Sequence, residues 1–163
     1  MIRIFGIVCL LALLPGCAGS TSPRRPSAVR TFPFAATRVE LYRAWNEPKP
    51  GTRELSTSRN GMKVFVESTP EITASDIANA QAEIDAQDEP TLVVLKVTFN
   101  ESGQKKMERL SRDHKGQRVA IFVDKQLRVA PELQYAISDS MQVLGAITQQ
   151  EAEAPAKASD VGK

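Results

Sequence analysis

Cys17 is the residue of this sequence best placed for covalent chemistry. It directly follows Leu14-Pro15-Gly16, behind an apolar stretch from Ile4 to Leu14 that has Arg3 ahead of it. That stretch is too short to span a bilayer as a helix, and small residues surround the expected cleavage site. The pattern predicts a signal peptide over residues 1–16, with Cys17 as the new N-terminus.

The segment Leu14-Pro15-Gly16-Cys17 resembles bacterial lipoprotein signals, which place a leucine three residues before the modified cysteine. Pro15 departs from that pattern, because the position usually carries a small or β-branched residue. The resemblance implies that the Cys17 thiol carries diacylglycerol and that its amine is acylated. Since each buried methylene contributes ~0.8 kcal/mol, several acyl chains form an anchor that hardly dissociates. The alternative is an ordinary secretory signal followed by a free cysteine.

Few other residues are suited to catalysis or metal binding. His114 is the only histidine, which removes most zinc sites and most Ser/His relays. Cys9 leaves with the signal and Cys17 is used by the lipid, so the exported part has no disulfide. Asp124 and Ser138-Asp139-Ser140 lack an activating base, and His114 is expected at a helix end as a capping group. We therefore expect no enzyme activity, no cofactor and no metal.

Three basic residues at helical spacing, Lys105, Arg109 and Arg112, are candidates for a binding surface. They could lay a basic stripe on anionic headgroups or on an acidic protein. Glu108 and Asp113 interrupt the positive charge, so an ordinary solvated helix face is the favoured alternative. The formal net charge of the whole chain is only +2, which argues against nucleic acid as a partner.

Trp45 is the aromatic candidate for binding a peptide or partner protein. Tyr42 lies close to it, and a loop containing Pro48 and Pro50 follows it. Aromatic residues dominate interface hot spots. A place at the edge of the core is the favoured alternative.

A single folded domain must position these candidates. Removal of the signal leaves 163 − 16 = 147 residues, enough for one domain with a sizeable core. Small, polar and proline residues over 17–36 predict a flexible tether, and similar composition predicts a disordered tail over 154–163. The domain is therefore expected over 37–153.

Alternating apolar and polar residues predict mainly strands in this domain. Thr91–Phe99 is expected at the centre of a sheet because it is apolar on both faces. Asn46–Asn60 is expected to be a loop, and Lys125 falls in a hairpin turn where glycine would be easier. The remaining expected strands are Arg38–Trp45, Met62–Glu67, Arg118–Val123, Leu127–Ala130 and Met141–Ile147.

Capping signals predict where the helices begin. Asn100 is expected to cap a helix that runs to about His114, with Met107 and Leu110 facing inward and Gly116 as the left-handed stop. The spacing in Thr73-Ala74-Ser75-Asp76 is that of a capping box.

A second capping box, Thr148-Gln149-Gln150-Glu151, predicts a short helix that ends before Pro155. Ala80–Ala86 fits both a helix and a strand. We prefer one or two helical turns after the first capping box and then a strand.

A series of short segments follows in a fixed order along the chain. They are Ile72-Thr73, Asp76-Ile77, Ala80, Val97-Thr98-Phe99, Gly103, Gly116 to Asp124, Ala130-Pro131, Val143, Gly145, Thr148 and Glu151-Ala152. Together they resemble the head subdomain of the first periplasmic domain of the SecD/SecDF protein-export membrane proteins, and the resemblance covers Met62 to Ala152. Two positions depart from the family, since Asp-Gly is usual at Asp124-Lys125 and phenylalanine at Ile147.

The resemblance implies an α+β fold, a mostly antiparallel sheet with one main packing helix. It also tips Ala80–Ala86 toward strand. SecD proteins continue into a base subdomain and membrane-spanning helices, whereas this sequence stops soon after Ala152. We therefore expect a stand-alone head on a lipid anchor.

The expected function is an envelope accessory module that binds a polypeptide or partner protein without catalysis and is linked to protein export. An open sheet edge at Leu127–Ala130 or Gln134–Ile137 would suit such binding. The alternative is a structural or remnant lipoprotein with no specific ligand. Partners are the membrane, through the lipid, and an envelope protein or unfolded polypeptide, with no small-molecule substrate. Because Ala18, not aspartate, follows Cys17, the resemblance favours the outer membrane over the inner.

Overall fold

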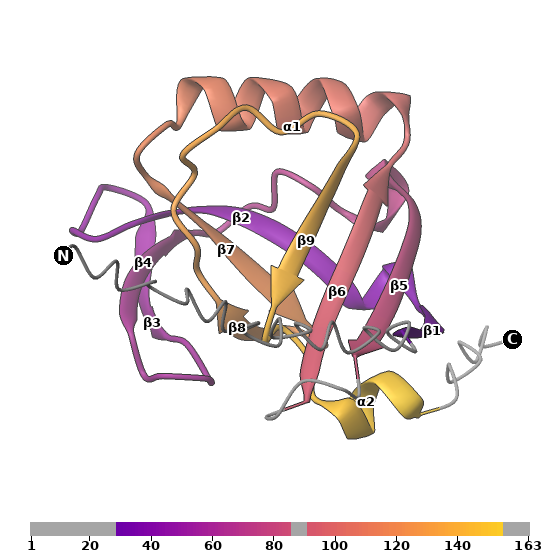
Figure 1. Cartoon of the computed structure of the whole chain (residues 1–163). Coiled ribbons are helices and arrows are strands. Elements are labelled where there is room, and N and C mark those ends of the chain that lie inside the picture. The colour runs from indigo at the N-terminus through magenta and orange to yellow at the C-terminus, as the bar shows by residue number, and fades with distance from the viewer. Residues whose placement is uncertain (1–28, 86–90, 155–163) are drawn as a thin grey trace, which may run out of the picture.

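Two antiparallel sheets, packed face to face, form the domain (Figure 1). The structure, a computed structural model, describes residues 29–85 and 91–154. The predictions for the signal peptide, for Cys17 and for the tail from residue 155 lie outside these residues. The fold class is therefore α+β and antiparallel as expected, but with two sheets where one was predicted.

The four-stranded sheet has the order β1-β5-β6-β9 and the five-stranded sheet the order β3-β4-β2-β7-β8. Within the described residues, all strand pairings in the two sheets are antiparallel. The first sheet comprises β1 (Val29–Phe34), β5 (Ile77–Asp85), β6 (Leu92–Phe99) and β9 (Ser140–Leu144). The second comprises β2 (Val39–Trp45), β3 (Thr52–Ser56), β4 (Lys63–Glu67), β7 (Arg118–Val123) and β8 (Gln126–Val129).

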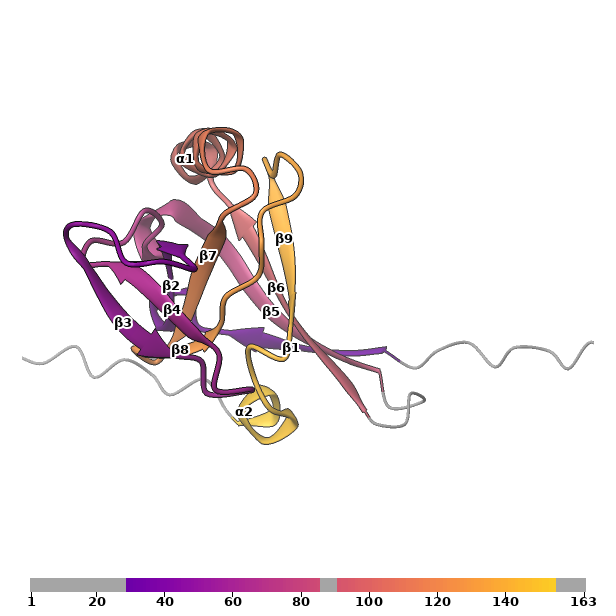
Figure 2. The same cartoon turned by 90° about the vertical axis from the view of Figure 1, so that its left-hand side faces the viewer.

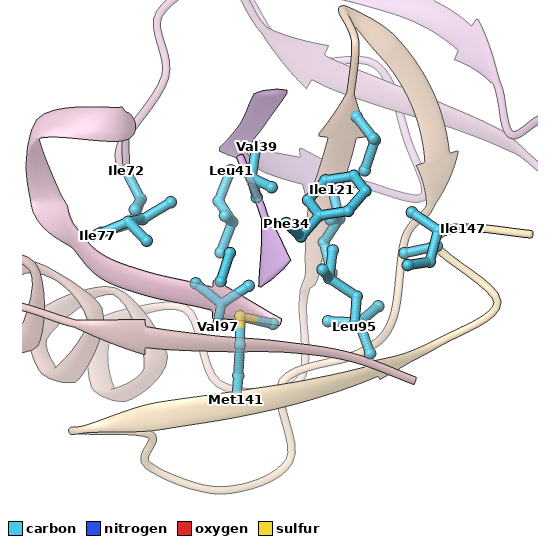
Figure 3. Packing of buried hydrophobic residues seen from close by; sticks show 14 of the residues in the cluster. Phe34, Val39, Leu41, Ile72, Ile77, Leu95, Val97, Ile121, Met141 and Ile147 are labelled. Carbon is cyan, nitrogen blue, oxygen red and sulfur yellow. The ribbon is translucent and has the colours of Figure 1, made fainter. Parts of the chain in front are cut away.

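The main core lies between the two sheets. Figure 3 shows Leu41 and Ile121 of the five-stranded sheet pointing toward Leu95 and Val97 of the four-stranded sheet, and all four are fully buried. The alternation that predicted β6 is the cause, since every second side chain of a strand faces the same side. β6 lies between β5 and β9, so its predicted central position is confirmed.

Helix α1 (Glu101–Asp113) lies across one end of the two sheets, and α2 (Gln149–Glu153) lies at the opposite end (Figures 1 and 2). The Asn100 side chain accepts a hydrogen bond of 3.0 Å from the Gly103 N–H. Met107 and Leu110 are buried. The predicted cap and inward face of α1 are therefore confirmed, and α2 begins at its predicted capping box.

The first capping box forms only one 3₁₀ turn, η2 (Ala74–Asp76), with both reciprocal hydrogen bonds present. The chain then enters β5 at Ile77, and β5 continues to Asp85. The open question over Ala80–Ala86 is thus settled as strand up to Asp85, while Ala86 lies outside the described residues. Ala80, Ala82 and Ile84 face the core, because alternation decides the structure once β6 offers a partner.

The expected tether over 17–36 is wrong from Val29 onward. β1 pairs with β5 from Val29↔Asp85 to Phe34↔Ala80, and a second 3₁₀ turn, η1 (Ala36–Arg38), follows it. Composition missed β1 because its stability comes from a distant partner strand. An edge strand also tolerates a proline such as Pro33.

One further strand was missed, and several strand boundaries differ from the prediction by one to three residues. β3 occupies part of the expected loop Asn46–Asn60, and it carries no alternation signal because it is largely exposed. β9 ends at Leu144 instead of Ile147, since Gly145 turns the chain with φ +71°. β8 begins at Gln126, one residue earlier than predicted.

Candidate functional site

A hollow of about 490 Å³ lies along the free edge of β9. We call this hollow the β9 groove. β9 and β8 are edge strands of the two sheets (Figure 2), and residues of both strands line the hollow. Its lining includes Arg59, Met62, Arg118, Val129, Pro131 and Leu144.

Two further hollows extend the β9 groove at its ends. One, of about 400 Å³, shares Pro131 and Gln142 with it and reaches Tyr135, which is 78% exposed. The other, of about 470 Å³, shares Arg59 and Leu144 and reaches Ile147. The exposed apolar surface therefore follows β9 along its whole length.

The backbone of β9 is open on the side away from β6. Phe99 N–H donates to the Asp139 carbonyl at 2.9 Å, and Gly145 N–H donates to the Val93 carbonyl at 3.5 Å. In an antiparallel ladder, residues alternately face the neighbouring strand and face away from it. Met141 and Val143 lie at every second position between Asp139 and Gly145, so their N–H and C=O groups also face β6. The N–H and C=O groups of Ser140, Gln142 and Leu144 therefore face the open edge.

The turn between β3 and β4 reaches both sheet edges. Ser58 N–H donates to the carbonyl of Leu127 on β8 at 3.0 Å. Arg59 Nη1 donates to the carbonyl of Leu144 on β9 at 3.1 Å. The turn itself is held by Thr57, whose hydroxyl accepts from Met62 N–H at 3.0 Å. The turn thus covers part of β8 and one carbonyl of β9, while the outward groups of Ser140 and Gln142 lie beyond it.

The β9 groove is positively charged. Arg118 donates to the Ala130 carbonyl at 2.7 Å and to the side chain of Asn46, both neutral acceptors. Among the described residues, neither Arg59 nor Arg118 forms an ion pair, and no acidic residue is among those that line this hollow. A ligand that brings a carboxylate would be favoured here.

The neighbouring hollow that reaches Ile147 is closer to neutral. Arg128 there is paired with Glu151. Burial works against ionisation of Glu151, but hydrogen bonds from Thr148 and Arg128 outweigh it and lower the pKa of this carboxyl. The positive charge of the groove therefore concentrates at Arg59 and Arg118.

Trp45, the aromatic candidate, lies outside the β9 groove. Its ring meets the His114 ring edge-on, with centroids 4.9 Å apart. His114 is the C-cap residue of α1, at the expected helix end, and its backbone N–H donates to the Leu110 carbonyl. Its side chain also ties the helix end to β2, because Nε2 donates to the Ala44 carbonyl at 3.2 Å. Burial lowers the pKa of His114, and this effect exceeds the opposing one of the Ala44 hydrogen bond.

The basic stripe of α1 is balanced by acidic neighbours. Lys105 Nζ lies 2.7 Å from a Glu101 oxygen, and Arg112 Nη2 lies 2.6 Å from a Glu108 oxygen. Arg109 is 3.9 Å from Glu71. These contacts resemble the surface pairs of an ordinary solvated helix. The structure does not bring the three residues to the β9 groove.

The residues with a conceivable catalytic role are engaged elsewhere. Asp124 binds the Arg38 guanidinium in a bidentate pair, with one bond of 2.7 Å. The Ser138 hydroxyl donates to Asp139 at 3.3 Å. Within residues 29–85 and 91–154, no group of three His, Cys, Asp or Glu side chains could hold a metal ion. The same residues include no helix with the length and apolarity needed to cross a membrane.

The sequence predicted one of these two sheet edges. Leu127–Ala130 was an expected edge, and β8 is one. Gln134–Ile137 forms no strand but lines the hollow that reaches Tyr135. The strand Met141–Ile147 was expected, but not as a sheet edge, and Arg59 and Arg118 were not among the candidate binding residues. The Asn-Gly pair at Asn60-Gly61 is a hairpin signal, and it could have placed Arg59 in a turn.

Comparison with known proteins points to one family. The sequence profile of the SecDF P1 head subdomain matches residues 52–158. The protein translocase subunit SecD of Aquifex aeolicus (strain VF5) is 34% identical over 103 residues, which cover 61% of this chain and 20% of the relative. The chain therefore spans about a fifth of the length of that relative.

Solved structures of SecDF are also similar. One, described as a membrane component that enhances protein export, matches with a TM-score of 0.51 and 20% identity, over 72% of this chain and 60% of the other. The super-membrane-facing form of SecDF matches with a TM-score of 0.48 and 20% identity, over 68% of this chain and 17% of the other. The first of these similarities agrees with the fold described above.

The profile match confirms the resemblance seen between Met62 and Ala152 and extends it at both ends, while β1 and β2 precede the matched range. The match covers well over half of the sequence. The chain therefore belongs to the SecDF P1 head subdomain family.

Proposed function

We propose that this protein is a lipid-anchored envelope module that binds polypeptide without catalysis, in a role linked to protein export. The observation that carries the proposal is the β9 groove, an exposed apolar hollow beside an open strand edge. Such an edge holds extended chains with little dependence on their sequence. Membership of the SecDF P1 head family supports the link to export.

The anchor is the second part of the proposal. Cys17 follows Leu14-Pro15-Gly16 in a lipoprotein-like signal, so we propose that the mature chain begins with lipidated Cys17. Ala18 behind it favours the outer membrane. The polar side chains that line the β9 groove are two arginines and two amides, Asn60 and Gln142. They suit binding better than acid–base or nucleophilic chemistry.

Site-specific crosslinking in intact cells tests polypeptide binding. A photo-crosslinking amino acid at Gln142 or Leu144, both exposed on β9, should yield adducts with exported polypeptides. The same probe at Lys105, exposed on α1, is the matched control. Equal and background-level adducts at all three positions would favour the alternative of a structural lipoprotein without a ligand.

The anchor is tested separately. Mass spectrometry of the purified mature chain should find acyl chains on an N-terminal Cys17. The Cys17→Ala variant should lose them and leave the membrane fraction. An unmodified N-terminal segment on soluble wild-type protein would contradict the anchor but not polypeptide binding.

A further inference from the structure

We propose that an extended polypeptide segment adds to β9 as an extra strand and that an acidic side chain of this segment pairs with Arg59 or Arg118. The inference rests on the proposed function and specifies how the polypeptide is held and which sequences are preferred. It follows from the open backbone of β9, the shape of the groove and its charge.

The backbone of β9 supplies the first argument. Ser140 and Gln142 direct their N–H and C=O groups away from β6, and a strand beside them would complete the ladder. Five residues of β9 span about 17 Å, enough to bind an extended segment of similar length. Strand addition uses backbone groups that every polypeptide carries.

The side chains along the edge supply the second argument. Met141 and Val143 point into the core, while Gln142 and Leu144 are exposed. The hollow between β9 and β8 offers Met62, Val129 and Pro131 to one face of an added strand. Alternate residues of the segment would therefore bury apolar side chains in the groove.

Arg59 supplies the third argument. It now donates to the Leu144 carbonyl, which lies on the open edge. An N–H of the added strand can take over that carbonyl, so a backbone hydrogen bond replaces the charge-assisted bond from Arg59. The released guanidinium can then pair with a carboxylate of the segment, and Arg118 offers a second cation in the same groove.

The test uses the full mature chain and a fluorescent peptide of about nine residues that alternates valine and threonine around a central glutamate. Binding is followed by fluorescence anisotropy, and hydrogen exchange of the Gln142 amide by NMR. We expect saturation with peptide to slow exchange of that amide at least about tenfold. A peptide N-methylated on both of its edges should bind at least about tenfold more weakly, because it cannot donate to the β9 carbonyls.

The protein variants isolate the backbone and the charge. Gln142→Pro removes an outward N–H that β6 does not use and should weaken binding. Gln142→Ala keeps this N–H and removes only the side chain, so it should weaken binding much less. Replacing the peptide glutamate by lysine should weaken binding about threefold, and Arg59→Ala should reduce that difference. Unfolding curves show whether each variant is folded, and the exchange measurement on wild-type protein does not depend on any variant.

The outcomes separate the two proposals. Peptide binding without protection of the Gln142 amide overturns strand addition and leaves polypeptide binding intact. Protection with equal affinity for the glutamate and lysine peptides overturns the acidic preference. No binding of any peptide up to about 1 mM overturns both strand addition and the proposed function.

Discussion

Arg59 Nη1 lies 3.1 Å from the carbonyl oxygen of Leu144, and this hydrogen bond joins the turn of one sheet to the edge strand of the other. The two residues are 85 positions apart in the sequence. The bond covers the one outward carbonyl of β9 nearest to the β3–β4 turn. The core that holds the two sheets together keeps these edges at a fixed distance.

Gly103 should not tolerate a larger side chain. A Cβ at this position would lie 2.0 Å from the carbonyl oxygen of Asp76, so α1 would have to move away from η2. Gly103→Ala should lower the free energy of unfolding by about 1–3 kcal/mol, as other overpacked sites do. Urea unfolding followed by circular dichroism measures the change. Lys105→Ala, exposed on the same helix, is the control and should change it by less than about 0.5 kcal/mol.

Asp76 should make the fold sensitive to acid. The side chain is 2% exposed and accepts a 2.8 Å hydrogen bond from Lys106. Burial opposes its ionisation, but the bonds from Lys106, Thr73 and Ser102 outweigh burial and lower the pKa of Asp76. A carboxyl with a lower pKa in the folded state stabilises the fold at pH values above its unfolded pKa of about 4. This contribution is lost as pH falls through the pKa of the folded state.

The Asp76→Asn variant tests this link. It should lose about 1–3 kcal/mol at pH 7 and show a weaker loss of stability between about pH 4 and pH 2 than wild type. Denaturant titrations at several pH values measure both effects. Asp113→Asn, exposed on α1, is the control at pH 7. An Asp76→Asn variant as stable as wild type would show that the buried bonds contribute little.

The His114–Trp45 contact should report a single titration. Each is the only residue of its type in the chain, and their ring centroids are 4.9 Å apart. Burial lowers the pKa of His114, so the unfolded chain takes up its proton first as pH falls below about 6.5. The contribution of neutral His114 to stability should therefore be complete above that pH. The free energy of unfolding should decline as pH drops toward the pKa of His114 in the folded protein.

Tryptophan fluorescence follows this titration directly. Emission from Trp45 should change as the neighbouring imidazole becomes charged, with a midpoint below about 6.5. His114→Gln keeps an amide that can donate to Ala44 but does not titrate, so the change should vanish. A fluorescence midpoint above that of a free histidine would contradict the role of burial.

The β7–β8 turn should gain stability from glycine. Asp124 and Lys125 have φ of +53° and +62°, a conformation in which a Cβ costs about 1 kcal/mol. Lys125→Gly should therefore raise the free energy of unfolding by up to about 1 kcal/mol, and thermal unfolding would show a higher midpoint. Lys125→Ala removes the charge and keeps the Cβ, so it should give no comparable gain.

The sequence predicted the elements whose signals are local. The Asn100 cap, the capping box at Thr148 and the alternation in β6 each depend on residues close together in the chain, and each appears in the structure. β1 was missed because its stability comes from pairing with β5, about fifty residues away. Resemblance to a family helped to identify β5 as a strand where the local pattern was ambiguous.

The groove was harder to predict for the same reason. Its lining comes from the β3–β4 turn, the start of β7, the end of β8 and β9. No local pattern indicates that Arg59 would meet Leu144, since their distance is set by the packing of two sheets. The candidates chosen by residue type, Trp45 and the basic residues of α1, lie elsewhere because such residues also occur in ordinary structural roles.

The position of β1 has a mechanical consequence. β1 and β9 are the two outer strands of one sheet, separated by β5 and β6, a distance of about 14 Å at the usual strand spacing. A force applied to the chain ahead of Val29 would act first on the hydrogen bonds between β1 and β5. A force on a strand bound at the β9 edge would act first on the hydrogen bonds between β6 and β9. The proposed anchor and the proposed bound polypeptide would therefore load different strand ladders of the same sheet, β1–β5 and β6–β9.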